Sequence, residues 1–310
     1  MPSGIDFCVL GPLAVRCGQG TIDFHGNRQQ VLLAALLLEA NRVVTADRLV
    51  DAVWGHTPPV SARSQVRICV SQIRRKLAEY DGGGLVETHS GGYLIRVPPQ
   101  RVDLYRFQEH AGLGRSAAKE GDPDTAAEHL RKALDEWNAP VPIGFAGEWA
   151  RFLLVKLEED RCAVAEEYIA VMLALGRHRE IVGELLCYAA EFPFRESLSA
   201  QLMLALHRSG RTTDALDLFR RTRLRFVTEL GIEPGPELRR MKQHVLDGTA
   251  GRPAVPDPGP RQPGSGAAAP RTEAGDSLAD RLLTLEREVV EMRSGLHRLL
   301  RASESRPSSR

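Results

Sequence analysis

A stretch of twenty residues, "SARSQVRICVSQIRRKLAEY" at positions 61–80, concentrates the positive charge of this chain. It holds four arginines and one lysine against the single acid Glu79, whereas the whole chain has a formal net charge of only +1. The planar guanidinium of arginine can form paired hydrogen bonds with the edge of guanine or with phosphate oxygens. The chemistry that this stretch suggests is therefore recognition of double-stranded nucleic acid.

The stretch also has the periodicity of an amphipathic helix. Its apolar stripe consists of Ala62, Val66, Cys69, Val70, Ile73 and Leu77. The polar residues of the opposite side are Ser64, Arg67, Ser71, Arg74 and Arg75. If this is a recognition helix in the DNA major groove, the residues that face base edges and nearby phosphates are Arg67, Ser71, Gln72 and Arg74. The residues expected to meet phosphate are Arg63, Arg75 and Lys76.

An alternative interpretation is a solvated helix face with scattered salt bridges. Two features favour nucleic acid. The face carries no acids that would neutralise these cations, and a glycine-rich hairpin, "GGGLVETHSGGYLIRV", follows the helix.

Enzymatic chemistry has little support in the sequence. The nine histidines form no H-x-x-x-H or H-E-x-x-H motif, and neither a P-loop nor a G-x-S-x-G turn occurs. The turn residue His89 is expected to be an ordinary polar loop residue. The five cysteines lie far apart without a C-x-x-C pair, which argues against a disulfide framework and a zinc ribbon. We expect no catalytic residue, no metal site and no cofactor.

The elements that must position the basic helix can be followed along the N-terminal part. Residues 5–24 are short β-like runs broken by glycine and proline, and "RQQVLLAALLLEANR" is typical of a helix. A second helix is expected to begin after Thr45 and to end at Gly55, before the loop "GHTPP". Strands, three helices and then a hairpin are the order of a winged-helix domain.

From residue 102 onward the pattern is helical. Three segments begin with a glycine and a polar residue, and each places apolar residues five and nine positions later: Ala126 and Leu130, Ile181 and Leu185, Ala215 and Phe219. The spacing from Gly176 to Gly210 is 34 residues, which is the tetratricopeptide period. We expect an all-α, tetratricopeptide-like domain here.

The C-terminal part changes character. Residues 249–277 are rich in proline and glycine, which predicts a disordered linker. A heptad pattern follows over 278–301, with core positions Leu278, Leu282, Leu285, Val289, Met292, Leu296 and Leu299. We interpret it as a coiled-coil helix that dimerises the chain. The alternatives are an amphipathic tail docked on its own domain, or an unfolded one.

The N-terminal motifs carry a specific resemblance. "RQQVLLAALLLEANRVVTADRLVDAVWGHTPPVSARSQVRICVSQIRRKL", followed by "GGYLIRV" and "VDLYRFQ", resembles the Streptomyces antibiotic regulatory protein family. The resemblance covers residues 5–247 and implies an OmpR-type winged helix followed by a bacterial transcriptional activation domain. It implies cytoplasmic, nucleoid-associated activators that bind direct repeats near the −35 element and recruit RNA polymerase through its sigma factor and the C-terminal domain of its alpha subunit.

Carried over by position, the family's recognition contacts fall on Arg67, Ser71, Gln72, Arg74 and Arg75. The wing falls on Thr88, His89 and Ser90. The segment that faces polymerase consists of His56, Thr57, Pro58 and Pro59. The partners implied are double-stranded promoter DNA, RNA polymerase and a second copy of the chain, with no membrane partner.

The sequence therefore predicts a mostly α fold with a small β component. The expected domains are a winged helix-turn-helix over 1–100, a tetratricopeptide-like activation domain over 101–248, a linker over 249–277 and a coiled-coil helix over 278–301. Another class remains open, in which a peptide- or ligand-sensing tetratricopeptide scaffold binds DNA only secondarily.

Overall fold

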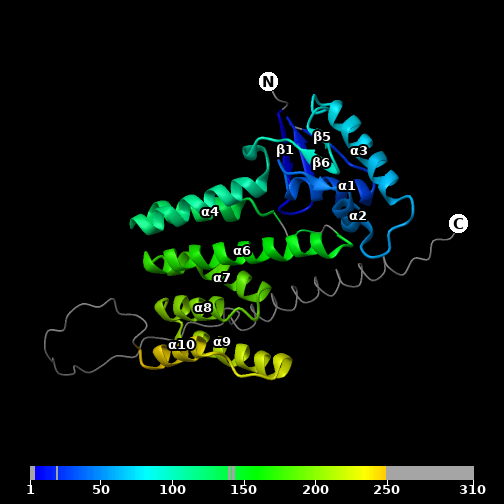
Figure 1. The fold of residues 1–310 in the computed structure, drawn as a ribbon. Helices are drawn as coiled ribbons and strands as arrows, with labels where there is room; N and C mark the ends of the chain where they lie inside the picture. Colours follow the sequence, from blue (N-terminus) through cyan, green and yellow to red (C-terminus); the bar gives the residue numbers. More distant parts are fainter. Residues whose placement is uncertain (1–3, 19, 139–140, 142–143, 249–310) are drawn as a thin grey trace, which may run out of the picture. The chain divides into compact units, whose positions relative to one another are not determined.

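The computed structural model of the chain describes residues 4–18, 20–138, 141 and 144–248 (Figure 1). The chain divides into two compact units between Val171 and Met172, and this division falls within the long helix α6 (Glu148–Ala174). The described strands and the helices α1 to α5 belong to the first unit, and α7 to α10 belong to the second.

The chain begins with an antiparallel sheet of three short strands, in the order β1 (Ile5–Cys8), β2 (Ala14–Cys17) and β3 (Gly20–Thr21). A buried carboxylate, Asp103, fixes the chain that leaves β1, because it accepts backbone hydrogen bonds from Val9 at 2.8 Å and Leu10 at 2.9 Å. Burial raises the pKa of Asp103, and these backbone donors act in the opposite direction. Asp103 thus ties the first sheet to the start of α4 (Asp103–Glu120).

Three helices follow: α1 (Asn27–Leu38), α2 (Ala46–Trp54) and α3 (Ala62–Ala78). The apolar run at the end of α1 is entirely buried, since both α2 and α3 pack against this helix. The Oγ1 atom of Thr45 accepts a hydrogen bond from the backbone N–H of Arg48 at 3.3 Å and caps α2. Helix α2 ends at Gly55, whose φ of 59° is readily adopted by glycine. Both predicted ends of α2 are confirmed.

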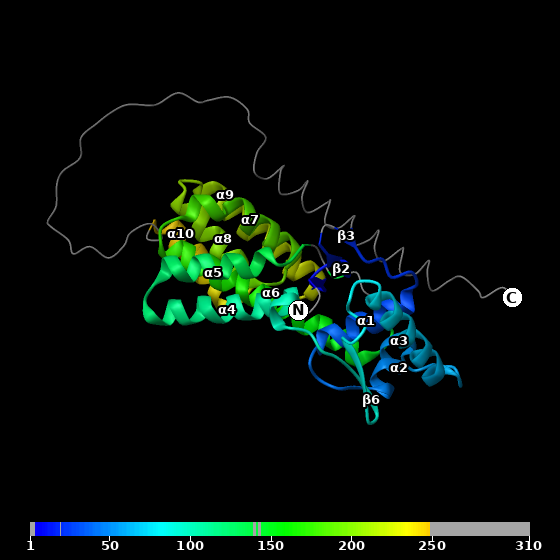
Figure 2. The ribbon, with the colours of Figure 1, turned by 90° about the horizontal axis from the view of Figure 1, so that it is seen from above.

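The second sheet contains the predicted hairpin, with the strand order β4 (Val44–Thr45), β6 (Gly92–Ile95) and β5 (Val86–His89). Figure 2 shows the hairpin extending beside α2 and α3. A Cβ atom at position 92 would lie 2.2 Å from the carbonyl oxygen of Val44, so only glycine lets β6 approach β4 this closely. The hairpin therefore depends on Gly92 for its pairing.

The remaining helices of the first unit are α4, α5 (Pro123–Asp135) and the greater part of α6. Helices α4 and α5 pack closely together, and a Cβ atom at Gly114 would come within 2.7 Å of the Leu130 side chain. A half-buried ion pair between Arg106 and Glu136, with an N–O distance of 2.7 Å, joins α4 to the residue that caps the end of α5.

The second unit consists of α7 (His178–Glu191), α8 (Glu196–Arg208), α9 (Thr212–Arg225), a π-helical turn η2 (Phe226–Leu230) and α10 (Pro236–Leu246). Helix α8 packs against α7, α9 and α10. Glycines with left-handed φ angles of 73° to 80° precede α5, α7 and α9. The six apolar residues predicted from the repeat are buried: Ala126, Leu130, Ile181, Leu185, Ala215 and Phe219. The predicted succession of glycine turns and helices is confirmed.

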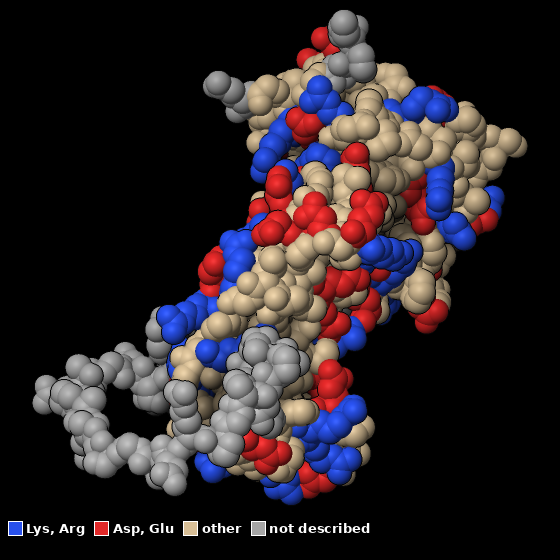
Figure 3. Space-filling view, turned by 90° about the vertical axis from the view of Figure 1, so that its left-hand side faces the viewer, with Lys and Arg blue, Asp and Glu red and all other residues tan. Residues whose placement is uncertain are grey.

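The predicted fold class is confirmed for the described part of the chain, which is mostly helical with a small β component and begins with a winged helix. The predicted linker and the coiled-coil helix, with all seven heptad residues, lie outside the described residues. Among the helices that the structure describes, none combines the length and the apolar character needed to cross a membrane. Figure 3 shows acidic and basic side chains interspersed over one face, in keeping with the small net charge.

Candidate nucleic-acid interface

Helix α3 turns one side to the core and the other to solvent. All six residues of the predicted apolar stripe are buried, with at most 8% of their surface exposed, and both α1 and α2 pack against the helix. The exposed residues of the opposite side are Arg63, Ser64, Arg67, Ile68, Ser71 and Arg75. The predicted amphipathic helix is confirmed, and its polar side is open to a ligand.

The side chains of two arginines on this side have no partner among the described residues. In the part of the chain that the structure describes, neither Arg67 nor Arg75 forms a hydrogen bond or an ion pair. They are separated by just over two helical turns, or about 12 Å along the helix axis. Both guanidinium groups can therefore bind phosphate or a base without first giving up an internal contact.

Two other cations are paired, and here the expectation of a helix face without neutralising acids is wrong. Arg63 lies 2.6 Å from the carboxylate of Asp47, which folding brings in from the first turn of α2. Lys76 lies 3.0 Å from the carboxylate of Glu79, the residue that caps the end of α3. Such solvent-screened pairs contribute little to stability, so either cation can exchange its carboxylate for a phosphate.

Arg74 joins the helix to the hairpin. Its Nε atom donates to the carbonyl oxygen of Val86 at 2.8 Å, and its Nη2 atom donates to Thr88 Oγ1 at 2.7 Å. Both acceptors belong to β5. The guanidinium has five N–H donors, and these bonds leave the two on Nη1 and one on Nη2 while fixing the direction of the side chain toward β5. The geometry favours a positioning role for Arg74 over the direct base contact expected from its place on the helix.

Gln72 also faces a neighbouring element. It is half-buried, and its Oε1 atom accepts a hydrogen bond from Gln29 Nε2 of α1 at 2.8 Å. Ser71, the residue before it, is exposed. Of the two residues expected to contact bases, Ser71 is exposed, whereas the side-chain oxygen of Gln72 is already hydrogen-bonded to α1.

The hairpin carries the three residues expected for a wing. Thr88, His89 and Ser90 are all exposed at its tip. The carboxylate of Glu87 accepts hydrogen bonds from Arg96 Nε at 2.6 Å and interacts with His89 Nε2 at 2.9 Å. Arg96, and then His89, lower the pKa of Glu87 to about 2. The carboxylate of Glu87 is thus ionised and compensated by its neighbours, which limits its repulsion of a phosphate backbone.

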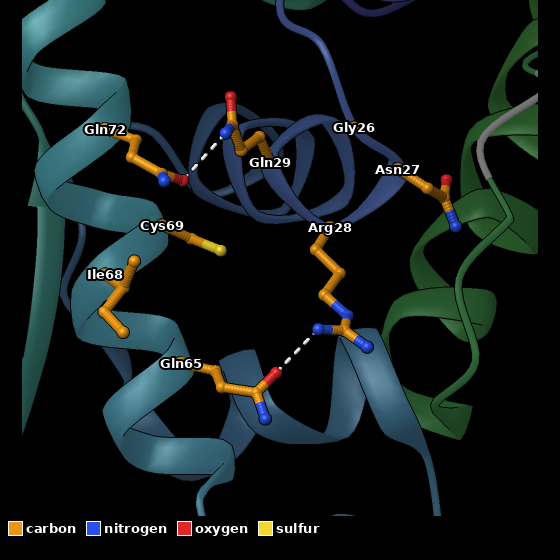
Figure 4. Close-up of a pocket in the computed structure, with 8 residues that line it drawn as sticks. All are labelled: Gly26, Asn27, Arg28, Gln29, Gln65, Ile68, Cys69 and Gln72. Carbon is orange, nitrogen blue, oxygen red and sulfur yellow. Dashed lines mark hydrogen bonds between the residues drawn. The ribbon is translucent and has the colours of Figure 1, made fainter. Parts of the chain in front are cut away.

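Figure 4 shows a hollow of about 520 Å³ where the first turn of α1 meets α3. Arg28 of α1 reaches across it and donates from Nη1 to Gln65 Oε1 at 2.7 Å. Ile68 lines the hollow from α3 with 56% of its surface exposed. The sequence interpretation missed these residues. The only signal for Ile68 was an apolar side chain outside the stripe, and no local signal pointed to Arg28.

The loop between α2 and α3 contains the segment expected to face polymerase. His56, Thr57, Pro58 and Pro59 are all exposed. The imidazole of His56 lies 3.5 Å from the carboxylate of Glu148, the first residue of α6. The neighbouring Val60, which the sequence interpretation did not include, is fully exposed. The loop therefore presents one fully exposed apolar side chain, which follows directly after two prolines that stiffen the chain.

Two family models match this chain. Residues 25–95 match "Transcriptional regulatory protein, C terminal", a range that contains all of α3 and the hairpin. Residues 102–246 match "Bacterial transcriptional activator domain", a range that contains α4 to α10.

Similar proteins cover most of the described residues. The regulatory protein DnrI of Streptomyces peucetius is 35% identical over 246 residues, which are 77% of this chain and 90% of DnrI. The transcriptional regulator RedD of Streptomyces coelicolor is 32% identical over 247 residues, which are 78% of this chain and 70% of RedD. The regulatory protein AfsR of Streptomyces coelicolor is 40% identical over 241 residues, which are 77% of this chain but only 24% of AfsR.

A solved structure is also similar to this chain. It is Mycobacterium tuberculosis EmbR in complex with a low-affinity phosphopeptide, with a TM-score of 0.70 and 31% identity. The similarity covers 79% of this chain and 65% of the EmbR chain. The chain thus spans less than two thirds of both EmbR and AfsR.

Proposed function

The chain belongs to the Streptomyces antibiotic regulatory protein family of transcriptional regulators, and from this premise we propose that it activates transcription of a secondary-metabolite gene cluster. It binds direct repeats near the −35 element of its promoters and recruits RNA polymerase. The observation that carries the proposal is the exposed cationic side of α3, where Arg67 and Arg75 form no ion pair within the described residues.

In this proposal some side chains of α3 contact bases and others contact phosphates. Arg67 and Ser71 are exposed on the side that enters the major groove and read base edges. Arg75 binds phosphate, and Arg63 and Lys76 join it by exchanging their exposed carboxylate partners for phosphate oxygens. This division assigns sequence preference to the middle of the helix and general affinity to its two ends.

The wing adds contacts to the backbone of the DNA. Thr88 and Ser90 offer hydroxyl donors at the tip, and His89 offers a ring nitrogen. Arg74 holds β5 against α3 through its two hydrogen bonds, so the wing meets the duplex at a fixed offset from the helix. The wing thereby sets the register of α3 in the groove.

The loop of His56 to Pro59 contacts RNA polymerase, through the sigma factor and the C-terminal domain of the alpha subunit. Its side chains are exposed in the loop that leads into α3. Val60 gives this surface an apolar anchor that a protein partner can bury. Loss of this contact should lower transcription while promoter affinity is retained.

The domain organisation follows the same proposal. Residues 1–100 bind DNA, residues 101–248 form the activation domain, residues 249–277 act as the linker, and residues 278–301 dimerise the chain on DNA. Support for the last two segments comes from their sequence pattern alone, since they lie outside the described residues. Sedimentation of the full chain and of a chain lacking residues 278–310 tests the dimer, which the shorter chain should not form.

A gel shift with the promoter of the neighbouring gene cluster tests the function. The full chain should shift a fragment that carries two direct repeats, and unlabelled repeat DNA should compete better than scrambled DNA of equal length. Equal competition by both would contradict sequence-specific binding.

The alternative, a peptide- or ligand-sensing scaffold with secondary DNA binding, gives a different result in the same experiment. It predicts weak retardation with no preference for the repeats. A chain that binds the repeats specifically and activates transcription from them in a reconstituted polymerase assay excludes it.

A further inference from the structure

The second unit carries a large hollow that the proposed DNA-binding role does not use. It has a volume of about 810 Å³ and lies between α9, η2 and α10. Its apolar lining consists of Leu216, Phe219, Leu224, Val227 and Leu246. The other lining residues are polar or charged, so the hollow combines apolar and cationic surface in a volume that can accept side chains of a partner.

Three of the apolar side chains are exposed to water within this one hollow. The exposed fractions are 63% for Leu224, 42% for Val227 and 53% for Leu246. They converge from the end of α9, from the π-helical turn and from the end of α10. π-helical turns often occur at functional sites, because the widened turn changes the direction of side chains. Single exposed leucines are ordinary, whereas a converging set marks a surface that another chain can cover.

The rim of the hollow is cationic. Arg239 and Lys242 lie one turn apart on α10, and within the described residues neither side chain forms a hydrogen bond or an ion pair. Arg223 first, and also the charge of Arg239, lower the pKa of Glu233. The ammonium of Lys242 lies 5.2 Å from the centre of the Phe219 ring in the floor. Two further arginines line the hollow, and Glu233, the acid among its described lining residues, is held by Arg223 at 2.6 Å. At the foot of Figure 3, basic side chains lie close together among a few acidic ones.

We propose that this hollow is a docking site for an acidic amphipathic helix of a partner protein. Apolar residues of the partner fill the space between Leu224, Val227 and Leu246. Carboxylates spaced three or four residues apart pair with Arg239 and Lys242, which have the matching spacing on α10. A nucleic acid would use the cations but leave the apolar lining in water, so the combination of both features favours a peptide. The proposal does not depend on promoter binding.

The test is fluorescence anisotropy with the full chain and a labelled synthetic helix of about 18 residues, or five turns. The probe carries leucines at helical spacing and glutamates beside them. We expect saturable binding of this probe, and no binding of a second probe in which lysines replace the glutamates. Lys242→Glu and Leu224→Ser should each weaken binding on the order of tenfold, which corresponds to about 1.4 kcal/mol.

Arg179→Glu is the matched control, because Arg179 is an exposed arginine on α7 of the same unit that does not line the hollow. It should bind the acidic probe like the original chain, and thermal denaturation should be alike for all variants. If Arg179→Glu lost as much affinity for the acidic probe as Lys242→Glu, the effect of Lys242→Glu would be explained by net charge alone, and the proposal would be overturned. The proposal is also overturned if the acidic probe does not bind the full chain, or if single-stranded or double-stranded DNA competes for the hollow as well as unlabelled probe does.

Discussion

Two single substitutions in α3, Arg67→Ala and Arg74→Ala, should have different effects, one on DNA affinity and the other on the stability of the hairpin. Arg67 is exposed and forms no hydrogen bond or ion pair in the described part of the chain, whereas Arg74 donates to Val86 and to Thr88. Arg67→Ala should therefore weaken DNA binding and leave stability unchanged. Arg74→Ala should lower stability and disturb the wing.

The magnitudes follow from these contacts. A hydrogen bond contributes about 0.5–1.5 kcal/mol, so the two bonds of Arg74 are together worth about 1–3 kcal/mol. In a compact unit such as the first one, Met1–Val171, each kcal/mol lowers the melting temperature by about 2–4 °C. A surface substitution without such partners changes stability by at most about 0.5 kcal/mol, which is the expectation for Arg67→Ala. Loss of a paired base contact costs about 1–3 kcal/mol, or roughly 5-fold to 150-fold in affinity.

The assay is anisotropy with a labelled promoter fragment over a series of salt concentrations, combined with thermal denaturation followed by circular dichroism. Arg75→Ala serves as the comparison for a phosphate contact. It should weaken binding to all sequences alike and reduce the slope of log K against log salt by about 0.9. If Arg67→Ala binds the promoter like the original chain while Arg74→Ala melts like it, the assignment of both side chains is refuted.

Three further outcomes are expected. Gly92→Ala should destabilise the first unit by about 1–3 kcal/mol or more in thermal denaturation, because the new Cβ would lie 2.2 Å from a backbone oxygen of β4. The carboxylate of Glu87 should titrate near pH 2 by NMR, and Arg96→Ala should raise that pKa. Since the folded pKa is below the unfolded one, the stabilisation by Glu87 is present above about pH 4.5 and is lost as the pH falls toward 2. Glycine at both His56 and Thr57 should leave promoter affinity nearly unchanged but lower transcription in a reconstituted assay, and equal loss of both would indicate a folding role.

The features that the sequence predicted correctly are local ones. The buried stripe of α3 follows from a repeat of three and four residues, and the ends of α2 follow from Thr45 and Gly55. The turns at Gly121, Gly176 and Gly210 follow from the need for a left-handed φ between helices. Each of these features depends on residues within about one or two helical turns of one another, so it can be predicted from a short stretch of sequence.

The partners of the charged side chains could not be predicted in this way. Asp47 is 16 positions before Arg63, and Thr88 is 14 positions after Arg74, so neither pair shares a helix. Periodicity places a side chain on a face but does not say which neighbouring element reaches that face. The same limit applies to the hollow beside α3, because Arg28 reaches Gln65 from a helix that begins 38 positions before that residue.

The bonds of Arg74 suggest how a winged helix can gain specificity from a residue that does not read bases. A wing held only by its strands could move relative to α3, and its phosphate contacts would then be compatible with several registers of the helix in the groove. Arg74 donates to both a backbone oxygen and a side chain of β5, which fixes the hairpin at two points along the strand. With the wing fixed, the proposed binding mode brings the wing and α3 to the duplex as one rigid surface, which holds α3 in one orientation in the groove. Phosphate contacts position a protein but carry no direct sequence information, so Arg74 would add to discrimination by keeping Arg67 and Ser71 in the geometry that base contacts require.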